Sequence, residues 1–410
     1  RLISAGLENA HVMETRSHPV VYGDWLHAGV ESPTILIYGH FDVQPIDPLD
    51  SWDSDPFKAR IDGEKIFGRG SSDDKGPMLI PIIVAESFLK TKGKLPVNIK
   101  FLFEGQEEMG SPHMAEFVEK NRQKFSCDMI FSADGAQWSE SESNLVTALK
   151  GFTCMQLEVL GANADQHSGL HGAAIANPIM ALSNIITSMK DQSGRVSIDG
   201  FYDDVIELSS EDRIQISKVP FSDKEYCQEV GVCNLTGEKG FTTLERIWGR
   251  PTLDLNGIWS GFQGEGIKTV LPSKASAKIS CRLVENQNPL KIFDKIDSHV
   301  KANLPTGVVA NLRRLPGYAL PFCIPPNHES TMIAKEVLTE TYGNPPYMIR
   351  AGASIPILPI FKDKLGVHAT VLAFSLDDEN MHAPNEFFRL SSFIKGQLIY
   401  GKLFNRLGGL

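Results

Sequence analysis

The sequence predicts an α/β protein in which a smaller α+β domain is inserted into a larger domain. In the first third, apolar runs of strand length alternate with helix-like stretches. Near Gly151 the pattern changes to segments in which apolar and polar residues alternate, as in a sheet with one solvated face. From about Asn327 the first pattern returns. We therefore expect residues 1–150 and 321–410 to form the larger domain and residues 151–320 the inserted one.

The larger domain is expected to contain short buried strands separated by helices, because its apolar runs are brief and bounded by polar residues. The expected strands are Thr34–Tyr38, Asn98–Phe103, Asp128–Ser132 and Ala369–Phe374. The expected helices are Pro77–Leu89, Thr331–Tyr342 and Phe387–Leu407. Proline near the start of the first helix and Gly343 after the second are typical helix boundaries.

The inserted domain is expected to place two helices on a sheet. Its expected strands are Phe152–Leu160, Ala275–Val284 and Val308–Leu315. Its expected helices are Ala173–Lys190 and Pro289–Asn303, which have apolar residues three or four positions apart. The polar segment Tyr202–Thr243 is expected to be loop with short elements.

Composition excludes several classes of function. The 410 residues include 40 Lys and Arg against 50 Asp and Glu, a net charge of −10, and no basic block, which argues against nucleic acid or an anionic membrane as partner. No apolar run reaches the ~18–20 residues that a spanning helix requires. The six cysteines form no C-x-x-C pair, so we expect reduced thiols and a cytoplasmic protein.

Histidine and acidic residues follow the predicted strands at the points where these strands end. His40 and Asp42 follow the first strand, Glu107 and Glu108 the second, and Asp134 the third. His382 comes after the fourth strand, and Asp73 immediately precedes a helix. Because ligand sites in open α/β sheets lie beyond the carboxyl ends of the strands, we expect these residues to converge.

A cluster of carboxylates is costly to bury unless cations neutralise it. Imidazole and carboxylate ligands suit zinc, with manganese as an alternative. Five ligands with one shared carboxylate suit two ions, which in di-metal sites are roughly 3.5–4 Å apart. Taken singly, each motif has a simpler interpretation as a loop pair or a solvated acidic face; their joint position favours a metal site.

The motifs together make the family recognisable. The sequence resembles the carnosinase and cytosolic non-specific dipeptidase branch of the di-zinc metallopeptidases, a superfamily that includes glutamate carboxypeptidase, aminoacylase and succinyl-diaminopimelate desuccinylase. The matching motifs are I-Y-G-H-F-D-V-Q-P at 37–45, W-D-S-D-P-F at 52–57, G-R-G-S-S-D-D-K-G at 68–76, E-G-Q-E-E-M-G-S at 104–111, D-Q-H-S-G at 165–169, K-T-V-L-P at 268–272, S-C-R-L-V at 280–284, G-A-S-I-P at 352–356 and M-H-A-P-N-E at 381–386. The resemblance implies a zinc-exopeptidase-like mixed sheet with helices on both faces, and an inserted lid and dimerisation domain. It also implies a further N-terminal helix before Arg1.

The resemblance assigns a role to each converging residue. It implies that His40 and Asp134 bind one ion, that Glu108 and His382 bind the other, and that Asp73 bridges both. It further implies that Glu107 is the general base acting on a metal-bridging water and that Asp42 orients His40. A cis peptide bond is expected between Asp73 and Asp74, as in relatives.

The resemblance also implies residues that bind substrate. His167 is expected to reach an active site, commonly that of the partner subunit of a homodimer formed through the inserted domain, and Arg282 to bind a substrate carboxylate. The remaining positions expected to line the cleft are Thr269, Asn256, Gly352 and Ser354. Ala351 stands where the family motif has Glu, Ala353 where it has Gly, and Asn256 where many members have His, which affects the expected substrate preference.

The expected activity is metal-dependent hydrolysis of dipeptides or short peptides. An N-acyl-amino-acid amidohydrolase or carboxypeptidase of the same superfamily is the alternative enzyme. Asp at position 134 favours the dipeptidase, because Glu tends to accompany deacylases and carboxypeptidases. A metal-free binding protein is a third hypothesis, which the presence of all five ligands and Glu107 disfavours.

Overall fold

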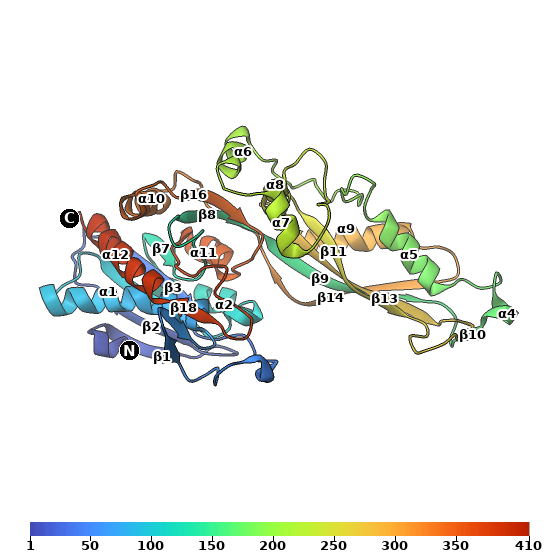
Figure 1. The fold of residues 1–410 in the computed structure, drawn as a ribbon, viewed down its shortest axis with the longest axis horizontal. Helices are drawn as coiled ribbons and strands as arrows, with labels where there is room; N and C mark the ends of the chain where they lie inside the picture. Colours follow the sequence, from blue (N-terminus) through green and yellow to red (C-terminus); the bar gives the residue numbers. More distant parts are fainter. Residues whose placement is uncertain (410) are drawn as a thin grey trace. The chain divides into compact units, whose positions relative to one another are not determined.

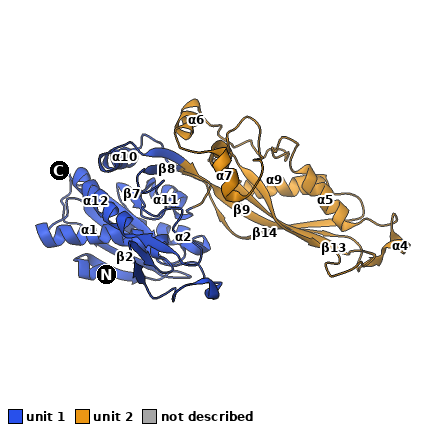
Figure 2. Ribbon diagram, in the orientation of Figure 1, with its two compact units in different colours: residues 1–147, 323–349, 355–410 blue, residues 148–322, 350–354 orange. Residues whose placement is uncertain are grey.

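The chain forms two compact units in a computed structural model that describes residues 1–409 (Figure 2). Unit 1 comprises Arg1–Thr147, Cys323–Ile349 and the chain from Ile355 onward. Unit 2 comprises Ala148–Phe322 and Arg350–Ser354. The short segment Arg350–Ser354 thus belongs to unit 2, whereas the expected boundary assigned it to the larger domain.

A six-stranded mixed sheet forms the centre of unit 1 (Figure 1). Its order is β1-β2-β6-β3-β7-β17. The strands are β1 (Glu8–Met13), β2 (Val20–Trp25), β3 (Thr34–His40), β6 (Asn98–Glu104), β7 (Met129–Ser132) and β17 (Ala369–Val371). Strands β6, β3, β7 and β17 are parallel to one another, and β1 and β2 are antiparallel additions at one edge. The carboxyl ends of four strands therefore meet along one edge of the sheet.

Helices cover both faces of this sheet, as expected from the resemblance. The unit contains α1 (Gly76–Lys92), α2 (Met114–Lys120), α3 (Arg122–Phe125), α10 (Glu329–Tyr342), α11 (Ile357–Leu365) and α12 (Leu390–Leu407). Ile37 belongs to the core formed with α1 and α12, which includes Ile80 and Phe404. Its neighbour Tyr38 instead packs its ring 5.6 Å from that of Phe361 in α11. Because successive strand residues point to opposite faces, α1 and α11 lie on opposite sides.

Smaller elements complete unit 1 and the connections to unit 2. One sheet has the order β18-β5-β4 and another β15-β8-β16. These strands are β4 (Arg60–Asp62), β5 (Lys65–Phe67), β8 (Asn144–Leu149), β15 (Phe322–Cys323), β16 (Tyr347–Ala351) and β18 (Phe387–Arg389). Short helical turns are η1 (Ile3–Ala5), η2 (Leu49–Ser51), η3 (Ser71–Lys75) and η4 (Glu107–Met109).

Unit 2 is an antiparallel sheet of order β11-β13-β9-β14, with α5 and α9 packed against it. The strands are β9 (Gly151–Leu160), β11 (Thr252–Ser260), β13 (Lys274–Leu283) and β14 (Val309–Ala319), and a separate pair is β10 (Gln166–His167) with β12 (Val270–Leu271). The helices are α4 (Ser168–His171), α5 (Pro178–Ser188), α6 (Ser210–Ser217), α7 (Asp223–Val230), α8 (Thr243–Gly249) and α9 (Pro289–Ala302). The core of this unit includes Leu182 and Ile296 against Leu157 and Ile279.

Two helices begin later than expected. The helix expected from Ala173 begins only at Pro178, because Ala173 has a positive φ of 63° and the Asn177 side chain caps the helix by accepting the N–H of Ile179. The C-terminal helix begins at Leu390, because the expected first turn pairs as strand β18 with β5. Within residues 1–409, none of the helices has both the length and the apolar character needed to cross a bilayer.

Candidate metal centre

The predicted convergence at the ends of the parallel strands is confirmed. His40 is the last residue of β3, and Glu107 and Glu108 lie in η4, just after β6. Asp134 follows β7, and His382 lies in the loop between β17 and β18. Because β6, β3, β7 and β17 are parallel neighbours, their carboxyl ends bring these side chains to one edge.

The converging side chains form two ligand groups that share one aspartate. The first is His40, Asp73 and Asp134, and the second is Asp73, Glu108 and His382; within each group the candidate ligand atoms lie within 4.8 Å of one another. Asp73 Oδ1 is 2.8 Å from His40 Nε2, and Asp73 Oδ2 is 2.8 Å from His382 Nε2. A carboxylate with one oxygen toward each group is the arrangement that a bridging ligand requires.

The backbone around Asp73 directs its side chain into the centre. Gly70 has a φ of 79°, which permits the turn before η3, and α1 follows directly at Gly76. The peptide bond between Asp73 and Asp74 is cis, as expected. Asp74 belongs to neither ligand group; its buried side chain accepts the backbone N–H of His40 with Oδ2 at 3.1 Å.

Asp42 supports both the first histidine and the two glutamates. Its Oδ1 lies 3.5 Å from His40 Nδ1, on the side of the ring away from Asp73. Its two oxygens also accept the backbone N–H groups of Glu107 at 3.2 Å and Glu108 at 2.9 Å. Asp42 therefore fixes the ring of His40 and the start of η4 at once, in the manner of residues that orient metal ligands.

The charges of the cluster fit divalent cations. Burial, together with repulsion from Asp73 and Glu108, raises the pKa of Asp134 to about 7. Burial and the nearby Asp134 also raise the pKa of Glu107 well above its usual value. Burial disfavours the charged form of His40, but the adjacent carboxylates of Asp42 and Asp73 raise its pKa nonetheless. Imidazoles and carboxylates in two three-residue groups are a suitable donor set for two divalent ions, so the residues present fit the implied metal pair.

Residues outside the expected set also shape this centre. The Gln44 side chain donates to Glu108 Oε2 at 2.7 Å. Glu104, the last residue of β6, is fully buried and accepts the hydroxyl of Tyr38 at 2.7 Å. Burial raises the pKa of Glu104 to about 7. Gln44 and Glu104 both lie within motifs that carry the family resemblance, and this was the one feature of the sequence that could have indicated a role for them. The hydrophobic pattern alone assigns them none.

The expected substrate-binding residues all lie in unit 2. Arg282 is exposed and its Nη1 donates to Ser354 Oγ at 3.2 Å. His167 and Thr269 lie together, because β10 pairs with β12 and Ser168 donates its N–H to the carbonyl of Thr269 at 3.0 Å. Asn256 lies at a bulge in β11, the strand in which Thr252 pairs with Arg282. Gly352 lies near Ile247: a Cβ added to Gly352 would be 3.5 Å from the Ile247 carbonyl oxygen.

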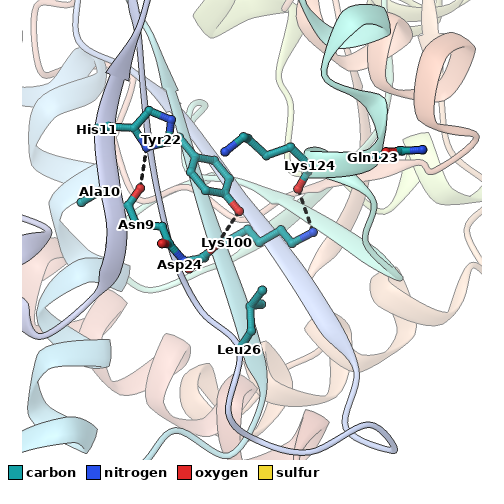
Figure 3. Close-up of a pocket in the computed structure, with 9 residues that line it drawn as sticks. All are labelled: Asn9, Ala10, His11, Tyr22, Asp24, Leu26, Lys100, Gln123 and Lys124. Atoms are coloured by element: carbon teal, nitrogen blue, oxygen red, sulfur yellow. Dashed lines mark hydrogen bonds between the residues drawn. The ribbon is translucent and has the colours of Figure 1, made fainter.

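A cavity of about 580 Å³ in unit 1 is separate from the ligand groups (Figure 3). Tyr22 donates its hydroxyl to Asp24 at 2.7 Å, and Lys100 donates to the carbonyl of Lys124 at 2.8 Å. The buried polar groups of its wall are thus satisfied within the protein, and none of the sequence-predicted site residues lines it.

The fold and the two ligand groups define the class of the protein, an α/β enzyme with two candidate metal-ligand groups at the edge of a mixed sheet. The chain belongs to peptidase family M20/M25/M40, whose model matches residues 36–406. It is therefore a metallopeptidase, and a divalent-metal requirement follows from the family together with the ligand groups.

Relatives cover nearly the whole chain. The Cys-Gly metallodipeptidase DUG1 of Candida albicans is 33% identical over 372 residues, which are 88% of this chain and 76% of the relative. The Beta-Ala-His dipeptidase of Homo sapiens is 30% identical over 385 residues, 92% of this chain and 75% of the relative. Among solved structures, an M20 family metallo-carboxypeptidase, Sso-CP2 from Sulfolobus solfataricus, matches with a TM-score of 0.86 and 30% identity, covering 100% of this chain and 92% of that one.

Proposed function

We propose that the protein hydrolyses dipeptides at a centre of two divalent metal ions. The observation that carries the proposal is the pair of ligand groups joined by Asp73, with Glu107 beside them. His40 and Asp134 would hold one ion, Glu108 and His382 the other, and Asp73 both. The donor set favours Zn²⁺, and Mn²⁺ suits the same ligands.

The chain's own residues account for the proton transfers. Two bound ions would supply polarisation of the scissile carbonyl and a water whose pKa is lowered toward neutrality. Glu107 accepts the proton of the attacking water and delivers it to the leaving amine nitrogen. Its carboxylate suits this task, because no hydrogen bond within residues 1–409 occupies it, whereas the neighbouring Glu108 is held by Gln44. Asp42 keeps both glutamates and His40 in place.

The substrate class follows from the relatives and from the polar groups of unit 2. Two relatives at 30% identity or more are named as dipeptidases, which supports a dipeptide substrate over an N-acyl amino acid. Arg282, exposed and bonded to Ser354, offers guanidinium donors that suit the substrate's terminal carboxylate. His167, Thr269, Asn256 and Gly352 are proposed to complete the substrate site.

The experiment is a panel of unblocked dipeptides, tripeptides, carboxyl-amidated dipeptides and N-acyl amino acids, assayed on one metal-reconstituted sample. The proposal predicts the highest kcat/KM for unblocked dipeptides and a large loss on amidation. A preference for N-acyl amino acids would support the amidohydrolase instead. A preference for longer peptides, cleaved at the carboxyl end, would support the activity named for the Sulfolobus solfataricus structure.

We also propose a homodimer formed through unit 2 and a cytoplasmic location. The edge strands of the unit 2 sheet carry exposed apolar side chains, with Ile258 60% and Val309 64% exposed. Such edges need a partner or a cover. The thiols of five cysteines are free, as suits a reducing compartment: Cys127, Cys154, Cys227, Cys233 and Cys281. A fully active monomer in sedimentation at micromolar concentration would contradict the dimer, and secretion of the protein in cell fractionation would contradict the location.

A further inference from the structure

The loop that carries Asp73 is held by a carboxylate 313 residues further along the chain. Glu386 is 1% exposed and lies four residues after His382. Its Oε1 accepts the backbone N–H groups of Ser72 at 2.9 Å and Asp73 at 3.0 Å. Its Oε2 accepts the N–H of Gly70 at 2.9 Å. Three backbone donors of one loop therefore converge on a single side chain.

Arg69 occupies the remaining place on this carboxylate. Its Nη1 donates to Glu386 Oε2 at 2.8 Å, and both side chains are 1% exposed. Each oxygen of Glu386 thus accepts two hydrogen bonds, which fills the acceptor capacity of a carboxylate. Glu386 has no lone pair left for a metal ion or for a proton in transit, so it is neither a ligand nor a general base. The guanidinium also neutralises a buried charge that would otherwise stand unpaired beside Asp73.

The segment that contains Glu386 makes further contacts with the same loop. The backbone carbonyl of Glu386 accepts the N–H of Gly68 at 2.9 Å. Glu379, which is fully buried, accepts the hydroxyl of Ser72 at 2.6 Å, and Ser375 donates to the carbonyl of Ser72 at 2.7 Å. The segment 375–386 therefore binds the Asp73 loop on both sides of His382, through Ser375 and Glu379 before it and through Glu386 after it.

We propose that Glu386 is a positioning residue that sets the Asp73 carboxylate between His40 and His382, and so determines the affinity of the centre for both ions. The inference rests on the proposed metal centre. Since Asp73 is the member common to both ligand groups, a shift of its backbone changes both groups together. Removal of an ordinary ligand such as Asp134 would affect one group first.

The test compares the variant Glu386→Gln with wild type by Co²⁺ calorimetry on metal-free protein, with the visible Co²⁺ spectrum as a second readout. Gln places an amide N–H₂ against donors, so the loop loses acceptors while side-chain volume is kept. Both dissociation constants should rise ~10–100-fold, the usual effect of losing a partner that orients ligands, and the spectrum should change. The milder variant Glu386→Asp keeps the charge but shortens the side chain by one methylene, and it should also raise both dissociation constants. It replaces Glu386→Gln in the test if that variant does not fold.

Glu238→Gln is the matched control. Glu238 is 8% exposed and pairs with Arg250 at 2.8 Å in unit 2, so its loss also breaks a buried arginine–carboxylate pair. This variant should lose thermal stability and keep both dissociation constants. Wild-type constants in both folded Glu386 variants would overturn the inference and leave the metal centre standing. Failure of wild-type protein to bind Co²⁺ would instead refute the metal centre itself.

Discussion

Glu107→Gln is expected to abolish most turnover without removing metal. No hydrogen bond within residues 1–409 reaches the Glu107 carboxylate, so an isosteric amide breaks no contact in the fold. Its backbone N–H, which binds Asp42 at 3.2 Å, is unchanged. The substitution removes only a proton acceptor, and lost general-base catalysis typically lowers kcat ~10²–10⁴-fold, or about 3–5 kcal/mol in the barrier.

Glu108→Gln should fail in a different way. Glu108 Oε2 accepts the amide of Gln44 at 2.7 Å and lies 3.4 Å from His382 Nε2, so its carboxylate faces the second ligand group. An amide in this position is a poor ligand, so the affinity for the ion of the second ligand group should fall. The loss should be at least ~10–100-fold, which is the usual effect of losing a residue that only orients a ligand. Added zinc or manganese should then partly restore turnover, which it should not do for Glu107→Gln.

The assay combines metal content by elemental analysis with kcat at limiting and at excess metal. Glu116→Gln, an acidic residue of α2 whose partners are Arg16 and Lys120, should retain both metal and activity. Loss of metal from Glu107→Gln together with full metal in Glu108→Gln would refute the assignment of base and ligand.

Three further predictions use other parts of the chain. Asp42→Asn should lower kcat/KM ~10–100-fold in steady-state kinetics, because an amide cannot accept both glutamate N–H groups and also face His40; unchanged kinetics would contradict this. Burial, with a smaller contribution from a nearby arginine, lowers the pKa of Lys150 from 10.5 to about 8. The unfolded chain then binds more protons between these values, so stability rises with pH across that window. Lys150→Met should therefore raise the free energy of unfolding, measured with denaturant, by up to about 3 kcal/mol at pH 7 and by almost nothing above pH 10.5. Equal increases at both pH values would contradict the lowered pKa of Lys150. Desolvation also raises the pKa of the half-buried Cys127 from 9.0 to about 12, a ~10³-fold loss of thiolate. Iodoacetamide should therefore label the exposed Cys233 first in mass spectrometry, and faster labelling of Cys127 would contradict the raised pKa.

The position of the candidate ligand groups could be predicted from the sequence because it depends on a simple topological rule. His40, Glu108 and Asp134 each come soon after an apolar run, and parallel strands bring such positions to one edge. The assignment of individual roles required the family resemblance, since spacing alone does not distinguish Glu107 from Glu108.

Other features depend on contacts that local pattern does not encode. In the sequence, nothing distinguishes the structural role of Glu386 from that of other acidic loop residues, because its partners Gly70 and Ser72 are more than 300 residues earlier in the chain. Strand β1 has no regular alternation, since four of its six residues are exposed. Phe387 and Phe388 are compatible with the first turn of a helix, yet they pair with Phe67 and Ile66 because a tertiary partner is present.

The most direct test of the proposed activity is a titration of metal-free protein with Zn²⁺, in which bound ions and hydrolysis of an unblocked dipeptide are followed in the same sample. We expect no hydrolysis without metal, binding of two ions per chain, and full activity only when both are bound. Undiminished hydrolysis by the metal-free protein, or a protein that holds two ions and cleaves no peptide, would contradict this expectation.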